Sequence, residues 1–244
     1  MMALVWGVGL GLTARRGLRA DDLPTKAPAA VIEAVQTERT KLEKTLAADP
    51  KNPALRQQLG EILCDLGANG DEAAADGAVK LFKALHEEKP QDAEILADYG
   101  NACTIFAQFA SIFTKLSWVH DGFNSMDAAI KESPDNVGAR VVRALNASMV
   151  PGFLDREKTA REDFGWLMQR IQSNPKEFTP DTLRTIYYYD GIFALKHEEA
   201  GCVQLLSQAA AIPPAPGDRL ASRIESSLKA AQAKFTPVPI SKAS

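Results

Sequence analysis

Hydrophobic residues recur at helical spacing along most of the chain. Val31, Val35, Leu42 and Leu46 follow this spacing up to Pro50, which predicts an amphipathic helix that the proline ends. Further stretches of the same kind follow, and segments that contain Pro or Gly separate them. The pattern predicts an all-α fold.

The clearest stretch, residues 49–90, predicts a helical hairpin. Its first helix carries Leu59-Gly60, and its second helix carries Ala78 and Phe82 before Pro90. Gly60 and Ala78 allow the two helices to approach closely, and Pro90 stops the second helix. These positions resemble the tetratricopeptide repeat, whose consensus sets Leu-Gly, an apolar residue, Ala, Phe, Ala and Pro in order over ~34 residues. Leu63 fills the apolar position of the consensus. Arg56 and Leu85 depart from it, because they stand where the family usually has Trp and Ala.

Three more hairpins follow along the chain. The second runs from Ala93 to Pro134 with Tyr99-Gly100 in place of Leu59-Gly60, the third covers about 137–175, and the fourth joins helices at 180–196 and 198–211. A final amphipathic helix is expected at about 218–235. The resemblance implies a right-handed α-solenoid over residues 27–235, with a capping helix at its N-terminal and C-terminal ends.

The repeats are longer than the family's usual length. The prolines that close them, Pro50, Pro90, Pro134 and Pro175, lie further apart than ~34 residues. The matched positions on either side place the surplus between the two helices of each hairpin, at 68–77, 106–122 and 149–154. In a stacked solenoid these turns share one edge, and such insertions often mark the binding side.

The second surplus segment is rich in aromatic residues. Phe106, Phe109, Phe113 and Leu116 continue the helical spacing, so one helix is expected from Ala93 to about 119. We expect it to pack on the helix at about 155–173, with the aromatic residues in an enlarged core. The alternative is an exposed apolar patch for a partner, in which Phe113 and Trp118 are candidate binding residues.

The third hairpin carries Arg140 and Arg143 at positions where the family normally has large apolar residues. They share a helix face with Asn146, and two guanidinium groups this close repel unless an anion lies between them. Asp98 and Asn101 of the preceding hairpin are also three apart, so Asp98 is expected to meet one arginine across the seam. The set is either a structural ion-pair network or an anchor for an acidic partner, with one arginine facing the groove.

Charge and composition exclude several classes of protein. The 244 residues include 28 Lys and Arg against 31 Asp and Glu, a net charge of −3. Such a chain has no cationic excess for nucleic acid or for an anionic membrane surface. The hydrophobic content of 45% is enough for a sizeable core.

The two ends of the chain give separate expectations. Residues 1–20 contain a short apolar run followed by Arg15-Arg16, which resembles a signal peptide and predicts export, to the periplasm. A cytoplasmic location is the alternative. No Cys follows the run, so a lipoprotein anchor is not expected. Residues 21–26 are expected to form a linker, and residues 236–244 a disordered tail.

Motifs for chemistry are sparse. The three His and three Cys lie far apart in the sequence, without metal-ligand spacing, so neither a metal nor another cofactor is expected. No set of titratable groups indicates a catalytic site. The resemblance therefore implies a non-catalytic scaffold that binds a peptide or protein partner in its groove, for example during assembly of an envelope complex. The alternatives are an obligate structural subunit of a larger complex and a helical-repeat enzyme.

Overall fold

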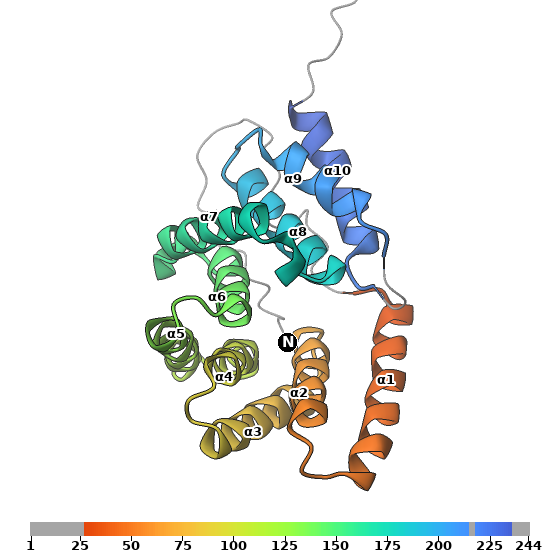
Figure 1. Cartoon of the computed structure of the whole chain (residues 1–244), viewed down its shortest axis with the longest axis vertical. Helices are drawn as coiled ribbons and strands as arrows, with labels where there is room; N and C mark the ends of the chain where they lie inside the picture. The colour runs from red at the N-terminus through yellow and green to blue at the C-terminus, as the bar shows by residue number, and fades with distance from the viewer. Residues whose placement is uncertain (1–26, 215–217, 236–244) are drawn as a thin grey trace, which may run out of the picture. The chain divides into compact units, whose positions relative to one another are not determined.

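The computed structural model describes residues 27–214 and 218–235, and within these ranges the chain is all-α (Figure 1). Ten α-helices and two 3-10 helices account for its regular structure, with no strand in the described ranges. The all-α prediction is confirmed. The proposed signal peptide, linker and tail lie outside the described residues.

The described residues form two compact units, 27–173 and the segment from 174 onward. In the first unit each helix packs against the next one in the chain, and α2 also contacts α4, as α4 contacts α6 (Figure 1). Its helices are α1 (Ala29–Ala48), α2 (Pro53–Ala68), α3 (Glu72–Glu88), α4 (Ala93–Phe106), α5 (Lys115–Glu132), α6 (Val137–Met149) and α7 (Glu157–Ser173).

Polar side chains explain where several of these helices begin. Asn52, Asp71, Asp92 and Asn136 each accept a hydrogen bond from the backbone N–H three residues further on. Each bond satisfies a donor that the first helical turn leaves without a partner. The sequence therefore sets the start of α2, α3, α4 and α6 locally.

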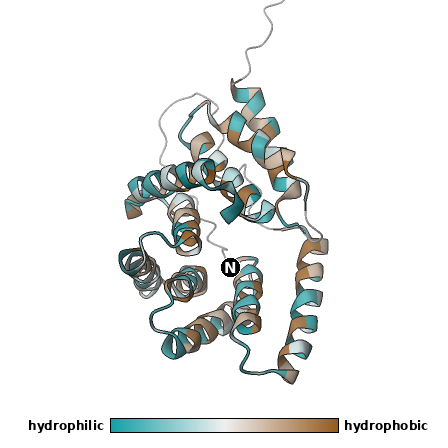
Figure 2. Cartoon of the chain, in the orientation of Figure 1, coloured by the Kyte–Doolittle hydropathy of each residue, from teal (hydrophilic) through white to brown (hydrophobic). Residues whose placement is uncertain are grey.

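One hydrophobic core of the first unit is formed by buried side chains of α1 to α4. Figure 2 shows that its helices carry both hydrophobic and hydrophilic residues, and the buried hydrophobic side chains gather where the helices meet. Phe82 is fully buried against Gly60, where a Cβ atom would lie 2.5 Å from the Phe82 ring. Gly60 thus makes room for Phe82, which is the close approach expected from the Leu-Gly position.

A second close approach joins α4 to α5. A Cβ atom on Gly122 would lie 2.6 Å from the carbonyl oxygen of Gly100, and one on Gly100 would lie 2.5 Å from the carbonyl oxygen of Gly122. The two backbones therefore cross in near contact, which only glycine permits at this pair of positions.

The predicted continuous helix over 93–119 is wrong. The first helix ends at Phe106, residues 107–114 form a turn, and α5 begins at Lys115. Phe106 then packs edge to face on Trp118, with ring centroids 4.9 Å apart, so the reversal buries part of both rings. Because the long helix does not exist, its predicted packing on α7 is wrong as well. The surplus segments of the first two hairpins are not only turns. Residues 72–77 belong to α3, and residues 115–122 belong to α5.

The second unit contains the 3-10 helix η3 (Pro175–Glu177), α8 (Pro180–Lys196), α9 (Cys202–Ala211) and α10 (Ala221–Phe235). Its helices form a separate hydrophobic core that includes Ile192, Leu206 and Ile224. Arg184 is buried at its base, with Nε 2.9 Å from Asp218 Oδ2 and Nη1 2.6 Å from the carbonyl oxygen of Ala209. This ion pair joins α8 to the segment that leads into α10.

Candidate functional site

Arg140 and Arg143 converge on one carboxylate, that of Asp163 in α7. Arg140 Nη1 lies 2.8 Å from Asp163 Oδ1, and Arg143 donates from Nε and Nη2 at 2.8 and 2.9 Å. The Asp163 side chain is fully buried. The carboxylate between the two guanidinium groups thus comes from the second helix of the same hairpin.

A second carboxylate extends this ion-pair network. Asp127 of α5 accepts from Arg143 Nη1 at 2.9 Å and from Arg156 Nη1 at 2.8 Å, and the Arg156 guanidinium lies 4.3 Å from the centre of the Phe123 ring. Burial tends to lower the pKa of Arg143, but the hydrogen bonds and charges of Asp163 and Asp127 outweigh it and raise that pKa. Helices α5, α6 and α7 are joined through these charges.

The network leaves little of either arginine for a ligand. Arg140 also donates to the carbonyl oxygen of Pro134 at 2.6 Å, and its guanidinium lies over the Trp166 ring at 4.4 Å. Side-chain exposure is only 11% for Arg140 and 13% for Arg143. Of the two interpretations, this geometry supports the structural network rather than the acidic-partner anchor.

Asp98 does not take part in this network, so its predicted pairing with an arginine is wrong. It lies between α4 and α2, where its Oδ2 accepts a hydrogen bond from Gln57 Nε2 at 3.2 Å. The residue is 7% exposed, and this burial raises the pKa of its carboxyl well above the usual value. The negative charges of Glu61 and Glu94 raise it further, which favours the protonated form.

Asn101 and Asn146, by contrast, are brought together. Asn146 Nδ2 donates to Asn101 Oδ1 at 3.0 Å, and Thr104 Oγ1 donates to Asn146 Oδ1 at 2.6 Å. These bonds join α4 and α6 near their C-terminal ends. They use much of the hydrogen-bonding capacity that a ligand would need.

The two remaining candidates, Phe113 and Trp118, have different environments. Trp118 is partly buried against Phe106 and the core, whereas Phe113 is 92% exposed. The expectation that Phe113 lies in an enlarged core is wrong, because the chain turns before it. Phe113 and its neighbour Ile112 are both exposed, as the alternative expectation of an exposed apolar patch requires.

Phe113 belongs to a group of exposed hydrophobic side chains at two neighbouring turns. The C-terminal ends of α4 and α6 lie together, as the bonds of Asn146 show, so the turns that follow these helices lie on the same edge of the unit. We call this group the apolar edge, and it consists of Ile112, Phe113, Leu116, Met149 and Phe153. Residues 107–114 and 150–154 contain no charged side chain.

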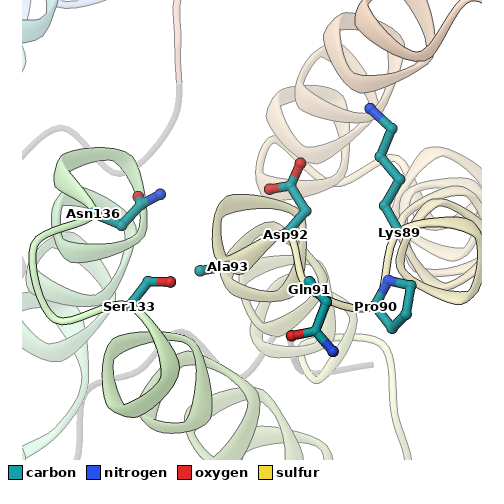
Figure 3. A pocket seen from close by; sticks show the side chains of 7 residues that line it. All are labelled: Lys89, Pro90, Gln91, Asp92, Ala93, Ser133 and Asn136. Carbon is teal, nitrogen blue, oxygen red and sulfur yellow. The ribbon is translucent and has the colours of Figure 1, made fainter.

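The opposite ends of α4 and α6 border an open hollow of about 520 Å³ (Figure 3). In this view Ser133 and Asn136 lie on one side, and the segment from Lys89 to Ala93 lies on the other. Asp92 and Asn136 cap their own helices with the side-chain oxygens. Two of the polar side chains that line the hollow are therefore already used as helix caps.

The described residues show little that could support chemistry. In this part of the chain no group of three or more His, Cys, Asp or Glu side chains could hold a metal ion. Cys64, Cys103 and Cys202 are buried free thiols, and burial raises the pKa of Cys64 well above its usual value and that of Cys103 to about 11. Raised pKa values disfavour the nucleophilic thiolate. None of the helices described is long and apolar enough to cross a membrane.

Sequence reasoning missed Asp163 and Asp127, whereas all five residues of the apolar edge fall within the surplus segments 106–122 and 149–154 that were expected to share one edge. One signal for Asp163 is present, because it falls within the helical stripe of Ala160, Phe164 and Leu167, all of which are buried. A charged residue within an apolar stripe indicates a buried partner. The edge also has a compositional signal, the two uncharged stretches 107–114 and 150–154.

Comparison of the chain with protein families, with curated proteins and with solved structures finds no match.

Proposed function

We propose that this chain is a non-catalytic helical scaffold that binds a protein partner through the apolar edge. The observation that carries this proposal is the exposure of three large hydrophobic side chains at adjacent turns: Phe113 at 92%, Ile112 at 80% and Phe153 at 73%. Contiguous exposed apolar surface is uncommon on a monomer and often marks an interaction site, and we propose that these side chains form one such surface.

The chemistry of the edge defines the kind of partner. Residues 107–114 and 150–154 lack charge, so the edge offers mainly hydrophobic contact, with the exposed Asp155 and the half-buried Arg156 beside it. Aromatic and aliphatic side chains of this size are typical anchors at the centre of protein interfaces. The partner surface is accordingly an apolar groove or helix face.

The scaffold belongs to the same proposal. The pairing of α2 with α3, α4 with α5 and α6 with α7, and the packing of Phe82 on Gly60, support hairpins of the tetratricopeptide type in a right-handed solenoid. We place α1 as its N-terminal cap and α10 as a C-terminal cap. Export to the periplasm is proposed from the apolar run in residues 1–20.

The test compares two charged variants of the full chain. Phe113→Asp places a charge on the edge, and Gln91→Asp does the same at an exposed position beside the hollow at the other ends of α4 and α6. A partner identified with the wild-type chain is then titrated against each purified variant. We expect at least a tenfold loss of affinity for Phe113→Asp and no change for Gln91→Asp. Equal affinities for the two variants would refute the edge as the binding surface.

A second candidate function is favoured by the same exposure. An obligate structural subunit would keep the edge permanently covered, and obligate interfaces are more hydrophobic than reversible ones. The isolated chain distinguishes the two. A stable, monodisperse monomer supports the reversible scaffold, whereas a chain that aggregates until its partner is present supports the obligate subunit.

A further inference from the structure

A groove in the second unit lies between α9 and α10, with Arg184 at its base. It encloses about 330 Å³. Its apolar lining comes from Ala210, Ala221, Ile224 and Leu228, and the polar side chains around it include Glu225, Lys229 and Gln232. The residues from α10 recur at helical spacing, so the groove follows that helix over several turns.

The chain leaves α10 at one end of this groove. Phe235 is the last residue of α10, and Gln232 lies one turn before it. Residues 236–244 follow, with the sequence TPVPISKAS. Pro237 and Pro239 favour an extended polyproline conformation and exclude continuation of the helix. Val238 and Ile240 are the large apolar residues of this segment.

We propose that residues 236–244 fold back along α10 and occupy this groove, with Ile240 on Leu228 and Lys242 beside Glu225. The lengths agree. From Pro237 to Ile240 an extended chain covers ~9 Å at ~3.1 Å per residue, and α10 covers ~10 Å from Phe235 back to Leu228 at 1.5 Å per residue. Two residues further along the segment, Lys242 comes level with Glu225, one turn before Leu228.

Chemical complementarity supports this occupant. The apolar side chain of Ile240 meets the apolar lining of the groove, and the ammonium group of Lys242 meets the carboxylate of Glu225. Because a segment of the same chain is held close to the groove by α10 itself, it binds at a high effective concentration. It then covers Leu228, which the core of the second unit buries only in part.

Photo-crosslinking of the full chain tests the proposal. With p-benzoylphenylalanine in place of Ile240, irradiation is expected to produce a crosslink within one chain, to the tryptic peptide 224–229. A crosslink mainly between two chains, a crosslink mainly to other peptides, or a yield no higher than in urea would overturn the proposal.

Charge variants of the crosslinking chain sharpen the test. Glu225→Lys is expected to reduce the yield severalfold, and adding Lys242→Glu to it is expected to restore the yield. Ser226→Lys is the matched control, since Ser226 is also exposed on α10 but does not line the groove, and it should leave the yield unchanged. Equal yields for Glu225→Lys and Ser226→Lys would remove Glu225 as the partner of Lys242 and refute the proposed register.

Discussion

Arg143 donates two hydrogen bonds to Asp163, from Nε to Oδ2 at 2.8 Å and from Nη2 to Oδ1 at 2.9 Å. This bidentate geometry is the one in which arginine binds a carboxylate most strongly. It holds α6 against α7 within a single hairpin. With Arg140 on the same carboxylate, the fully buried Asp163 pairs with two guanidinium groups, and Asp127 supplies a second negative charge to Arg143.

Replacement of Asp163 by Asn should strongly destabilise the protein. The variant leaves two poorly exposed guanidinium groups without that negative charge, and breaking a buried pair in this way costs ~3–5 kcal/mol. Urea denaturation followed by circular dichroism measures the loss. Asp76→Asn is the control, because Asp76 pairs with Lys80 on an exposed face of α3 and its loss should cost ~0.5 kcal/mol or less. Similar losses in the two variants would contradict the structural role of Asp163.

Asp98→Asn should make stability depend less on pH. The pKa of Asp98 in the folded chain is raised above its unfolded value, first by burial and then by Glu61 and Glu94. The folded state therefore binds the Asp98 proton more tightly. The contribution of Asp98 to the stability of the folded state is fully present below the unfolded pKa of its carboxyl. This contribution declines as the pH rises from there through the folded pKa.

The measurement for Asp98 is the urea midpoint between pH 4 and pH 8. Relative to wild type, Asp98→Asn is expected to gain stability as the pH rises, because an amide pays no cost of ionisation and still accepts the hydrogen bond from Gln57. Other titrating groups are common to both chains, so the difference isolates this residue. A difference that stays constant or falls with pH would contradict the raised pKa.

Gly122→Ala should destabilise the crossing of α4 and α5. The added Cβ would lie 2.6 Å from both the carbonyl oxygen of Gly100 and Cγ2 of Thr104, so the backbones must separate at a cost of ~1–3 kcal/mol. Gly165→Ala in α7 is the matched control, since nothing lies within 4 Å of its added Cβ and alanine favours the helix by roughly 0.5–1 kcal/mol. We expect thermal melts to shift in opposite directions. A Gly122→Ala variant that melts at or above wild type would be inconsistent with this crossing.

Phe113→Asp should leave the free energy of unfolding within ~0.5 kcal/mol of wild type, because the side chain is 92% exposed. Phe106→Ala provides the comparison. It removes the contact with Trp118 at 4.9 Å and is expected to cost ~1–3 kcal/mol, less than a full core truncation. Chemical denaturation of both variants decides the point. If Phe113→Asp is the more damaging change, Phe113 is buried in solution.

Local information was sufficient for many of the helices. Pro50, Pro90 and Pro134 mark the ends of hairpins because proline cannot continue a helix, and the capping residues Asn52 and Asp92 act within four residues of their own positions. The close packing at Gly60 was also visible in the sequence, because the glycine stands at the position that faces the second helix in such hairpins.

The turn after Phe106 could not be predicted in the same way. The apolar spacing continues through Phe109 and Phe113 to Leu116, so periodicity alone favours one helix. The chain reverses where Phe106 can pack on Trp118, at the same turn where Gln108 Nε2 donates to the carbonyl oxygen of Gly67 at 2.8 Å. These are contacts between different helices, and hydrophobic spacing along one segment contains no information about them.

The amino-acid sequence thus carried the helical class, the hairpin boundaries and the need for an anion between Arg140 and Arg143, since propensity, capping and charge repulsion act over a few residues. Tertiary packing decided that Asp163 supplies that anion, that Asp98 turns to Gln57, and that Phe113 faces solvent. The physical reason is that each of these outcomes depends on which distant side chain approaches within ~3–4 Å, and many pairings satisfy the same local pattern.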